Sequence, residues 1–149
     1  MRGRNSQPEQ RHQRPRGGAA AVELALVLPL LIFLALGCVD FGRYAYYSIA
    51  VQNAARAAAA YAVINPYPTD APAIWTSALA QAAVDEIANQ TGYTPGALSV
   101  SSSVSFDKSS GLPNISVTTN YTGFSTVINW PGIPHNPTLS ASLVVRGIR

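Results

Sequence analysis

The stretch GGAAAVELALVLPLL, from Gly17 to Leu31, begins the long apolar run of the sequence, in which Glu23 is the single charge between residues 19 and 39. About 21 helical residues at about 1.5 Å each reach about 31 Å, close to the roughly 30 Å of a bilayer's hydrocarbon core. We therefore expect one membrane-spanning helix over 19–39, with a kink at Pro29 that membrane helices tolerate. A carboxylate at the bilayer centre costs about 2.5–3.5 kcal/mol, so the position of Glu23 requires an explanation.

Basic residues are concentrated before the apolar run. Residues 1–18 contain five arginines and one glutamate, a net charge of +4, so the rest of the chain contributes −1 to the overall +3. The folded part is therefore not basic, and no nucleic-acid partner is expected. Arginines flanking a span favour the cytoplasm for their side. We expect a cytoplasmic N-terminus, contact with membrane lipid over the span, and an extracytoplasmic C-terminal part. Cys38 is the only cysteine, so this part folds without an internal disulfide.

The long helix is expected to continue past the membrane as an amphipathic segment over 40–64. Apolar side chains recur there at spacings of three and four, and Asn65 before Pro66 ends the pattern. Three tyrosines lie where an interfacial aromatic belt would be: Tyr44, Tyr46 and Tyr47.

A second helix is predicted to begin near Thr69 or Asp70, which are both capping residues, with Pro72 in its first turn and Gly92 as its stop. The expected buried face consists of Ile74, Trp75, Ala78, Leu79, Ala82 and Ile87.

The periodicity then changes to two, which predicts three strands over 98–106, 115–121 and 139–146. The turn-forming stretch DKSSGLPN joins the first two strands, and a longer loop containing NWPGIPHNP precedes the third. A sheet with one apolar face needs a cover, and the amphipathic half of the long helix is available for it. We therefore expect an α+β fold in which 65–149 forms an extracytoplasmic domain of one helix and a small antiparallel sheet.

The residues before the span resemble the processing site of type IV prepilins. In that site a membrane peptidase cuts after glycine and leaves glutamate fifth in the mature chain. Cleavage between Gly18 and Ala19 gives this spacing for Glu23, whereas cleavage after Gly17 would place the acid sixth. The resemblance implies that the basic leader 1–18 is removed by a prepilin peptidase.

The resemblance becomes more specific along the helix. The segments VELA at 22–25, DFGR at 40–43 and NAAR at 53–56, together with Pro29, are similar to the N-terminal signature of TadE-like proteins of the Tad (Flp) pilus system. Family members often continue with glycine and a second arginine, where this chain has four alanines. The closing stretch LSASLVVRGIR also fits, and the length favours a TadE-like minor pseudopilin over the shorter Flp pilins and the longer TadG-like proteins.

This resemblance implies a pilin-like fold and a structural role in assembling a Tad pilus that supports surface adhesion. The implied partners are the prepilin peptidase, other Tad pilins and pseudopilins, and the inner-membrane Tad assembly platform. The same resemblance implies assembly roles for Glu23, Asp40, Arg43 and Arg56.

The acid in the span then has a physical explanation. A buried carboxylate is tolerated when it is paired, and cleavage creates a new α-amino group on Ala19 that is able to pair with Glu23 in the same or a neighbouring chain. Asp40 and Arg43, three residues apart on one helix, form either a simple surface ion pair or contacts with a neighbouring subunit.

Two other classes of protein compete with this interpretation. One is a membrane-anchored or lipidated surface protein of unknown binding function, since ALGC, at 35–38, faintly resembles a lipobox that would make Cys38 a lipidated N-terminus. A secreted binding module is the third class, and the mature N-terminus separates all three. No metal-ligand spacing, nucleophile motif or phosphate-binding loop is present in the sequence, so we expect no enzyme activity, cofactor or metal.

Overall fold

The computed structural model describes residues 17–147, which form two compact units that divide between Ala35 and Leu36. Of the expected leader 1–18, only Gly17 and Gly18 lie among the described residues. Helix α1 runs over Gly17–Ile64 and is helical on both sides of Pro29. Among the described residues it is the one helix long and apolar enough to cross a membrane. A single-pass membrane protein fits this observation.

Helix α2 covers Pro72–Ala88 and begins with proline in its first turn, as expected. The expected cap is wrong: Ala71 occupies the N-cap position and makes no side-chain hydrogen bond there. Proline supplies the φ that a first helical turn needs and lacks an N–H that would require a partner, so the helix starts without a polar cap.

The buried face of α2 follows a strict spacing of four: Trp75, Leu79, Ala83 and Ile87. Three expected core residues are therefore wrong. Ile74 is 73% exposed, Ala78 and Ala82 are only half-buried, and Ala83, which was not expected, is fully buried. Neighbouring helical residues point about 100° apart, so a narrow contact buries Trp75 and leaves Ile74 outside.

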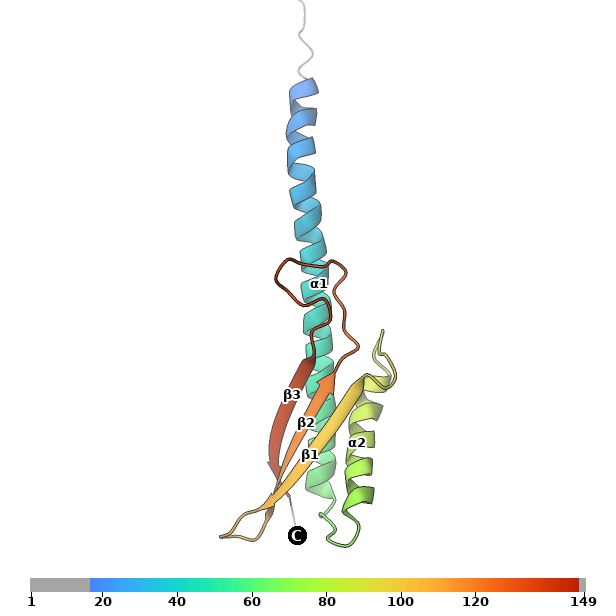
Figure 1. Cartoon of the computed structure of the whole chain (residues 1–149), viewed down its shortest axis with the longest axis vertical. Helices are drawn as coiled ribbons and strands as arrows, with labels where there is room; N and C mark the ends of the chain where they lie inside the picture. Colours follow the sequence, from blue (N-terminus) through green and yellow to red (C-terminus); the bar gives the residue numbers. More distant parts are fainter. Residues whose placement is uncertain (1–16, 148–149) are drawn as a thin grey trace, which may run out of the picture. The chain divides into compact units, whose positions relative to one another are not determined.

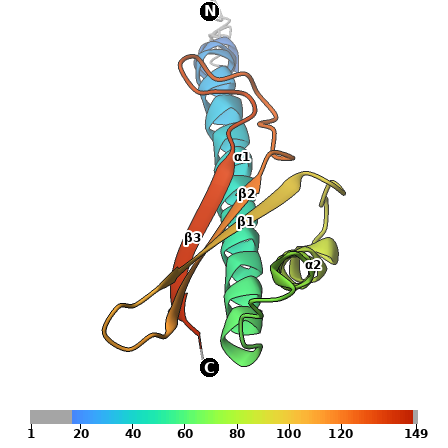
Figure 2. The ribbon, with the colours of Figure 1, turned by 60° about the horizontal axis from the view of Figure 1, so that its bottom comes forward.

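Three antiparallel strands follow in the order β1-β2-β3: Leu98–Phe106, Pro113–Tyr121 and Leu139–Arg146. Every second residue of the central strand β2 is buried, as its period-two pattern predicts. The α+β class and the three-stranded antiparallel sheet are therefore confirmed. Figures 1 and 2 show the sheet lying beside the second half of α1, with α2 on the side of β1.

The second half of α1 contributes a stripe of small residues to the core: Ala50, Val51, Ala54, Ala58 and Ala62. Their size lets the helix backbone approach the sheet closely. The buried hydroxyl of Thr119 on β2 donates to the carbonyl of Val51 at 3.2 Å and to that of Ala141 at 3.4 Å. One hydroxyl thus links the helix, the central strand and the edge strand β3, and it leaves no polar group unpaired there.

Tyr47 of α1 lies in the core rather than on the surface of the helix. Tyr47 is only 7% exposed and stacks on Tyr121 with the ring centroids 5.6 Å apart. Its hydroxyl donates to the carbonyl oxygens of Thr91 and Gly92, at 3.2 and 2.9 Å. The interpretation of Tyr47 as part of an aromatic belt is therefore wrong, because the sheet and the loop after α2 enclose its ring.

The turn between β1 and β2 is organised by Asp107. Its carboxylate accepts the backbone N–H of Ser109 at 2.9 Å and the hydroxyls of Ser109 and Ser110 at 2.8 and 3.0 Å. Arg146 at the end of β3 pairs with it at 2.9 Å. These contacts, the Ser109 N–H first among them, lower the pKa of Asp107 to about 2.

Candidate functional site

The expected processing residues lie in the first turn of α1. Gly18 and Ala19 are helical and exposed, and no other described atom lies within 4 Å of a Cβ placed on Gly18. Glycine is among the poorest helix formers, so the helix costs less to unwind at Gly17 and Gly18 than in the alanine- and leucine-rich stretch that follows.

Glu23 lies one turn further along α1 and is exposed. Within residues 17–147 no basic side chain forms an ion pair with it. Any charge that compensates this carboxylate in a membrane must therefore come from a group other than the basic side chains of residues 17–147.

Asp40 has a different environment, because it is 5% exposed and its carboxylate is surrounded by donors. Its Oδ1 accepts the backbone N–H of Val127 at 2.7 Å, and its Oδ2 accepts that of Ile128 at 3.3 Å. The indole N–H of Trp130 donates to Oδ2 at 2.9 Å. Asp40 therefore fastens the long loop before β3 to the helix, and three donors stabilise its ionised form.

Arg43 follows one turn later and pairs with Asp40, with 3.6 Å between Nη1 and Oδ1. The expected ion pair between these residues is thus present, although it is longer than the hydrogen bonds from the loop. The guanidinium also lies 5.6 Å from the ring centroid of Phe124, a cation–π arrangement. Its side chain is still 40% exposed, so part of it faces outward.

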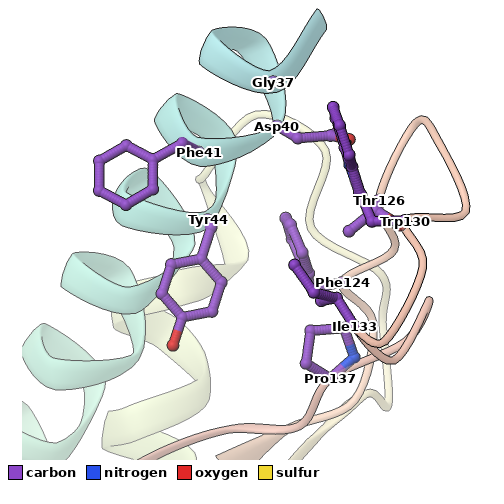
Figure 3. A pocket seen from close by; sticks show the side chains of 9 residues that line it. All are labelled: Gly37, Asp40, Phe41, Tyr44, Phe124, Thr126, Trp130, Ile133 and Pro137. Atoms are coloured by element: carbon purple, nitrogen blue, oxygen red, sulfur yellow. The ribbon is translucent and has the colours of Figure 1, made fainter. Parts of the chain in front are cut away.

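An open hollow of about 540 Å³ lies beside Asp40, between α1 and the loop before β3. Figure 3 shows aromatic and aliphatic side chains of both segments around it, with Trp130 next to Asp40. A Cβ at Gly37 would lie 3.4 Å from Cη2 of Trp130, so the indole stands directly over this glycine. The sequence analysis named Asp40 as a site residue, but it did not predict the hydrogen bonds that Asp40 accepts from the loop before β3.

Arg56 is exposed and lies 13 residues after Arg43 on α1, about three and a half helical turns further along. Its Nη1 donates to Oδ1 of Asn53 at 3.0 Å, and no carboxylate among the described residues pairs with it. Together with Gln52 it borders a second, more polar hollow against residues 140–143 of β3. The signature segment at 53–56 therefore presents its two polar residues outward, while Ala54 and Ala55 are fully buried.

The remaining candidates are not brought together. Cys38 is exposed on α1, and within residues 17–147 no three His, Cys, Asp or Glu side chains are grouped so as to hold a metal ion. The candidate charged residues instead lie apart along α1, and only Asp40 and Arg43 pair with each other.

The sequence model of the TadE-like proteins matches residues 18–60. No curated protein and no solved structure shows significant similarity to the chain. The matched segment begins at Gly18 and contains Glu23, Asp40, Arg43 and Arg56. Residues 18–60 are thus a TadE-like segment, which is consistent with a TadE-like protein of the Tad pilus system.

Proposed function

We propose that this chain is a minor pseudopilin that is cut between Gly18 and Ala19 and then helps to assemble a Tad pilus. The observation that carries the proposal is the TadE-like match that starts at Gly18 and includes Glu23, five residues after the proposed cut. The exposed apolar helix and the exposed charges of Glu23 and Arg56 support it, because they leave groups available for other subunits.

The proposed partners are a prepilin peptidase, other Tad pilins and pseudopilins, and the inner-membrane assembly platform. The arginine-rich leader supports a cytoplasmic N-terminus in the bacterial inner membrane, with the α+β domain on the outer side. The assembled pilus would support adhesion to surfaces.

The mature N-terminus tests the processing step. Mass spectrometry of the protein from the membrane fraction should give a chain that begins at Ala19. Gly18→Leu should leave the leader attached, because a side chain before the cut obstructs the peptidase. Gly17→Leu is the matched control, and it should be cut normally. A chain that begins at a lipid-modified Cys38, or a normally cut Gly18→Leu protein, would refute the proposed processing.

Glu23→Gln tests the assembly step separately. The change keeps the shape of the side chain and removes its charge, so membrane insertion should not suffer. The amino group created by cleavage is largely protonated at neutral pH and would lose its partner. We expect a protein that is cut and membrane-bound but supports no pili.

The matched control is Glu86→Gln, which removes an exposed acid from α2. It should leave the number of pili, counted by electron microscopy, at the wild-type level. Normal piliation with cut Glu23→Gln protein would show that this charge does not act in assembly.

A further inference from the structure

The loop over 122–138 has an unusual surface for a segment of an exported domain. It contains no aspartate, glutamate, lysine or arginine. Val127 and Ile133 are 56% and 55% exposed, and Phe41 on the adjoining turn of α1 is 74% exposed. Phe41 and Ile133 line one open hollow, and the charged groups beside it are the nearly buried Asp40 and the partly exposed Arg43.

The contacts of this loop fix its level along the helix. Trp130 stands over Gly37 and bonds to Asp40, and both residues belong to the same compact unit as the loop. Gly37 is also part of the expected span 19–39. Two residues of helix, about 3 Å, separate it from the end of that span. A loop held at Gly37 is therefore level with the boundary between hydrocarbon and headgroups.

We propose that the 122–138 loop is a second membrane contact, which lies in the interfacial layer of the bilayer and places Val127 and Ile133 against lipid. This inference rests on the proposed membrane span. Tryptophan prefers the same layer, because its ring is apolar and its N–H is polar. The indole N–H of Trp130 is already satisfied by Asp40, so the ring enters the interface with no unpaired donor.

Lipid is favoured over a second protein copy by continuity and by charge. Within the Leu36–Arg149 unit the loop contacts Gly37, which belongs to the expected span, and the exposed part of Arg43 follows four residues after the end of that span, where lipid phosphates would be. The open hollow between Phe41, Tyr44 and Ile133 adds apolar surface at this level. The Asp40 contacts thus do more than close a loop, because they hold it at the depth where its side chains meet lipid.

Quenching of tryptophan fluorescence by lipids tests the depth of the loop. The full chain is reconstituted in phosphatidylcholine vesicles with or without bromine in the upper part of the acyl chains. The sequence has two tryptophans, and Trp75 is only 4% exposed, in the core between α1 and α2. We expect brominated lipid to remove more than half of the Trp130 signal, taken as the difference between wild type and Trp130→Phe. The Trp75 signal that remains in Trp130→Phe should be nearly unchanged.

A pair of charge substitutions tests the loop surface directly. Ile133→Asp should reduce the quenching of Trp130, because a carboxylate withdraws the loop from the interface. Ile74→Asp is the control, since Ile74 is also exposed, at 73%, but lies on α2, and it should leave quenching unchanged. Equal, weak quenching of Trp130 and Trp75 would overturn the proposal, as would protection of Trp130 that depends on the protein-to-lipid ratio and so indicates a second copy.

A separate measurement distinguishes failure of the loop proposal from failure of the span. Protein that is extracted from the vesicles by alkali has no membrane span, which would refute the proposed membrane protein itself. Protein that resists alkali while Trp130 remains unquenched refutes the loop contact alone.

Discussion

Two glycines in the connection between α2 and β1 allow the packing of Tyr47 to be measured. Gly92 and Gly96 both have φ of +80°, where an L side chain is strained. A Cβ at Gly92 would overlap the hydroxyl oxygen of Tyr47, whereas no described atom lies within 4 Å of a Cβ at Gly96. Gly96→Ala therefore measures the conformational cost alone, and Gly92→Ala adds the collision.

The expected magnitudes follow from these contacts. The left-handed conformation costs alanine about 1–2 kcal/mol at either position. Tyr47 cannot swing away cheaply, because its ring stacks on Tyr121 and meets the edge of Phe124. At Gly92 the new methyl group must therefore displace the Tyr47 hydroxyl from the two carbonyl oxygens that share its single proton, and leaving that hydroxyl unpaired adds about 1–2 kcal/mol. Tyr47→Phe removes the colliding oxygen, so in that background Gly92→Ala should cost no more than Gly96→Ala.

The assay is urea denaturation of the full chain in detergent, followed by tryptophan fluorescence, since both tryptophans lie in the Leu36–Arg149 unit. With a urea m-value of about 1.5 kcal/mol/M, the extra cost at Gly92 lowers the midpoint by about 0.7–1.3 M relative to Gly96→Ala. The double variant should cancel this difference. Equal urea midpoints for Gly92→Ala and Gly96→Ala would refute the enclosed position of the Tyr47 hydroxyl. It would also be refuted if Gly92→Ala lowered the midpoint as much in the Tyr47→Phe background as in the wild type.

Two further predictions concern the core and the turn. Ala58→Leu overfills a fully buried position between α1 and the sheet and should destabilise the unit by about 1–3 kcal/mol, whereas Ala60→Leu on the exposed side should change the same urea midpoint little. The lowered pKa of Asp107 means that its carboxylate contributes stability above its ordinary value near pH 4 and loses that contribution as the pH falls toward about 2. Asp107→Asn should therefore be less stable than wild type at pH 6, and its free energy of unfolding should change less between pH 4 and pH 2. The same change in the free energy of unfolding for both proteins over this range would contradict the prediction.

The sequence predicted the elements of this fold better than their contacts. Period-two alternation predicted all three strands, because burial of one face imposes it directly on a strand. The prediction of Ile74 rather than Ala83 as a core residue was wrong. Hydrophobicity alone identifies apolar residues, and the width of the contact with α1 decides which of them are buried.

The partners of Asp40 were beyond sequence reasoning altogether. They lie 87–90 residues away along the chain, in a loop without periodicity. Such a contact depends on where the sheet places the ends of β2 and β3, which local patterns do not specify. The sequence did show that the loop over 122–138 has no aspartate, glutamate, lysine or arginine and contains three prolines and a tryptophan. Nothing in this composition indicates that the loop binds Asp40.

Glu23 and Asp40, the two acids of the matched segment 18–60, differ in the partners that their carboxylates have. Asp40 is satisfied within its own chain by two backbone N–H groups, an indole and Arg43, so its replacement should first release the 122–138 loop. Glu23 has no such partner within residues 17–147, and a membrane offers it none. Only Glu23 thus requires a compensating charge from cleavage or from another subunit. A defect in pili without a defect in the stability of the domain is consequently expected from Glu23→Gln, whereas in Asp40→Asn any such defect should follow the loss of the loop contact.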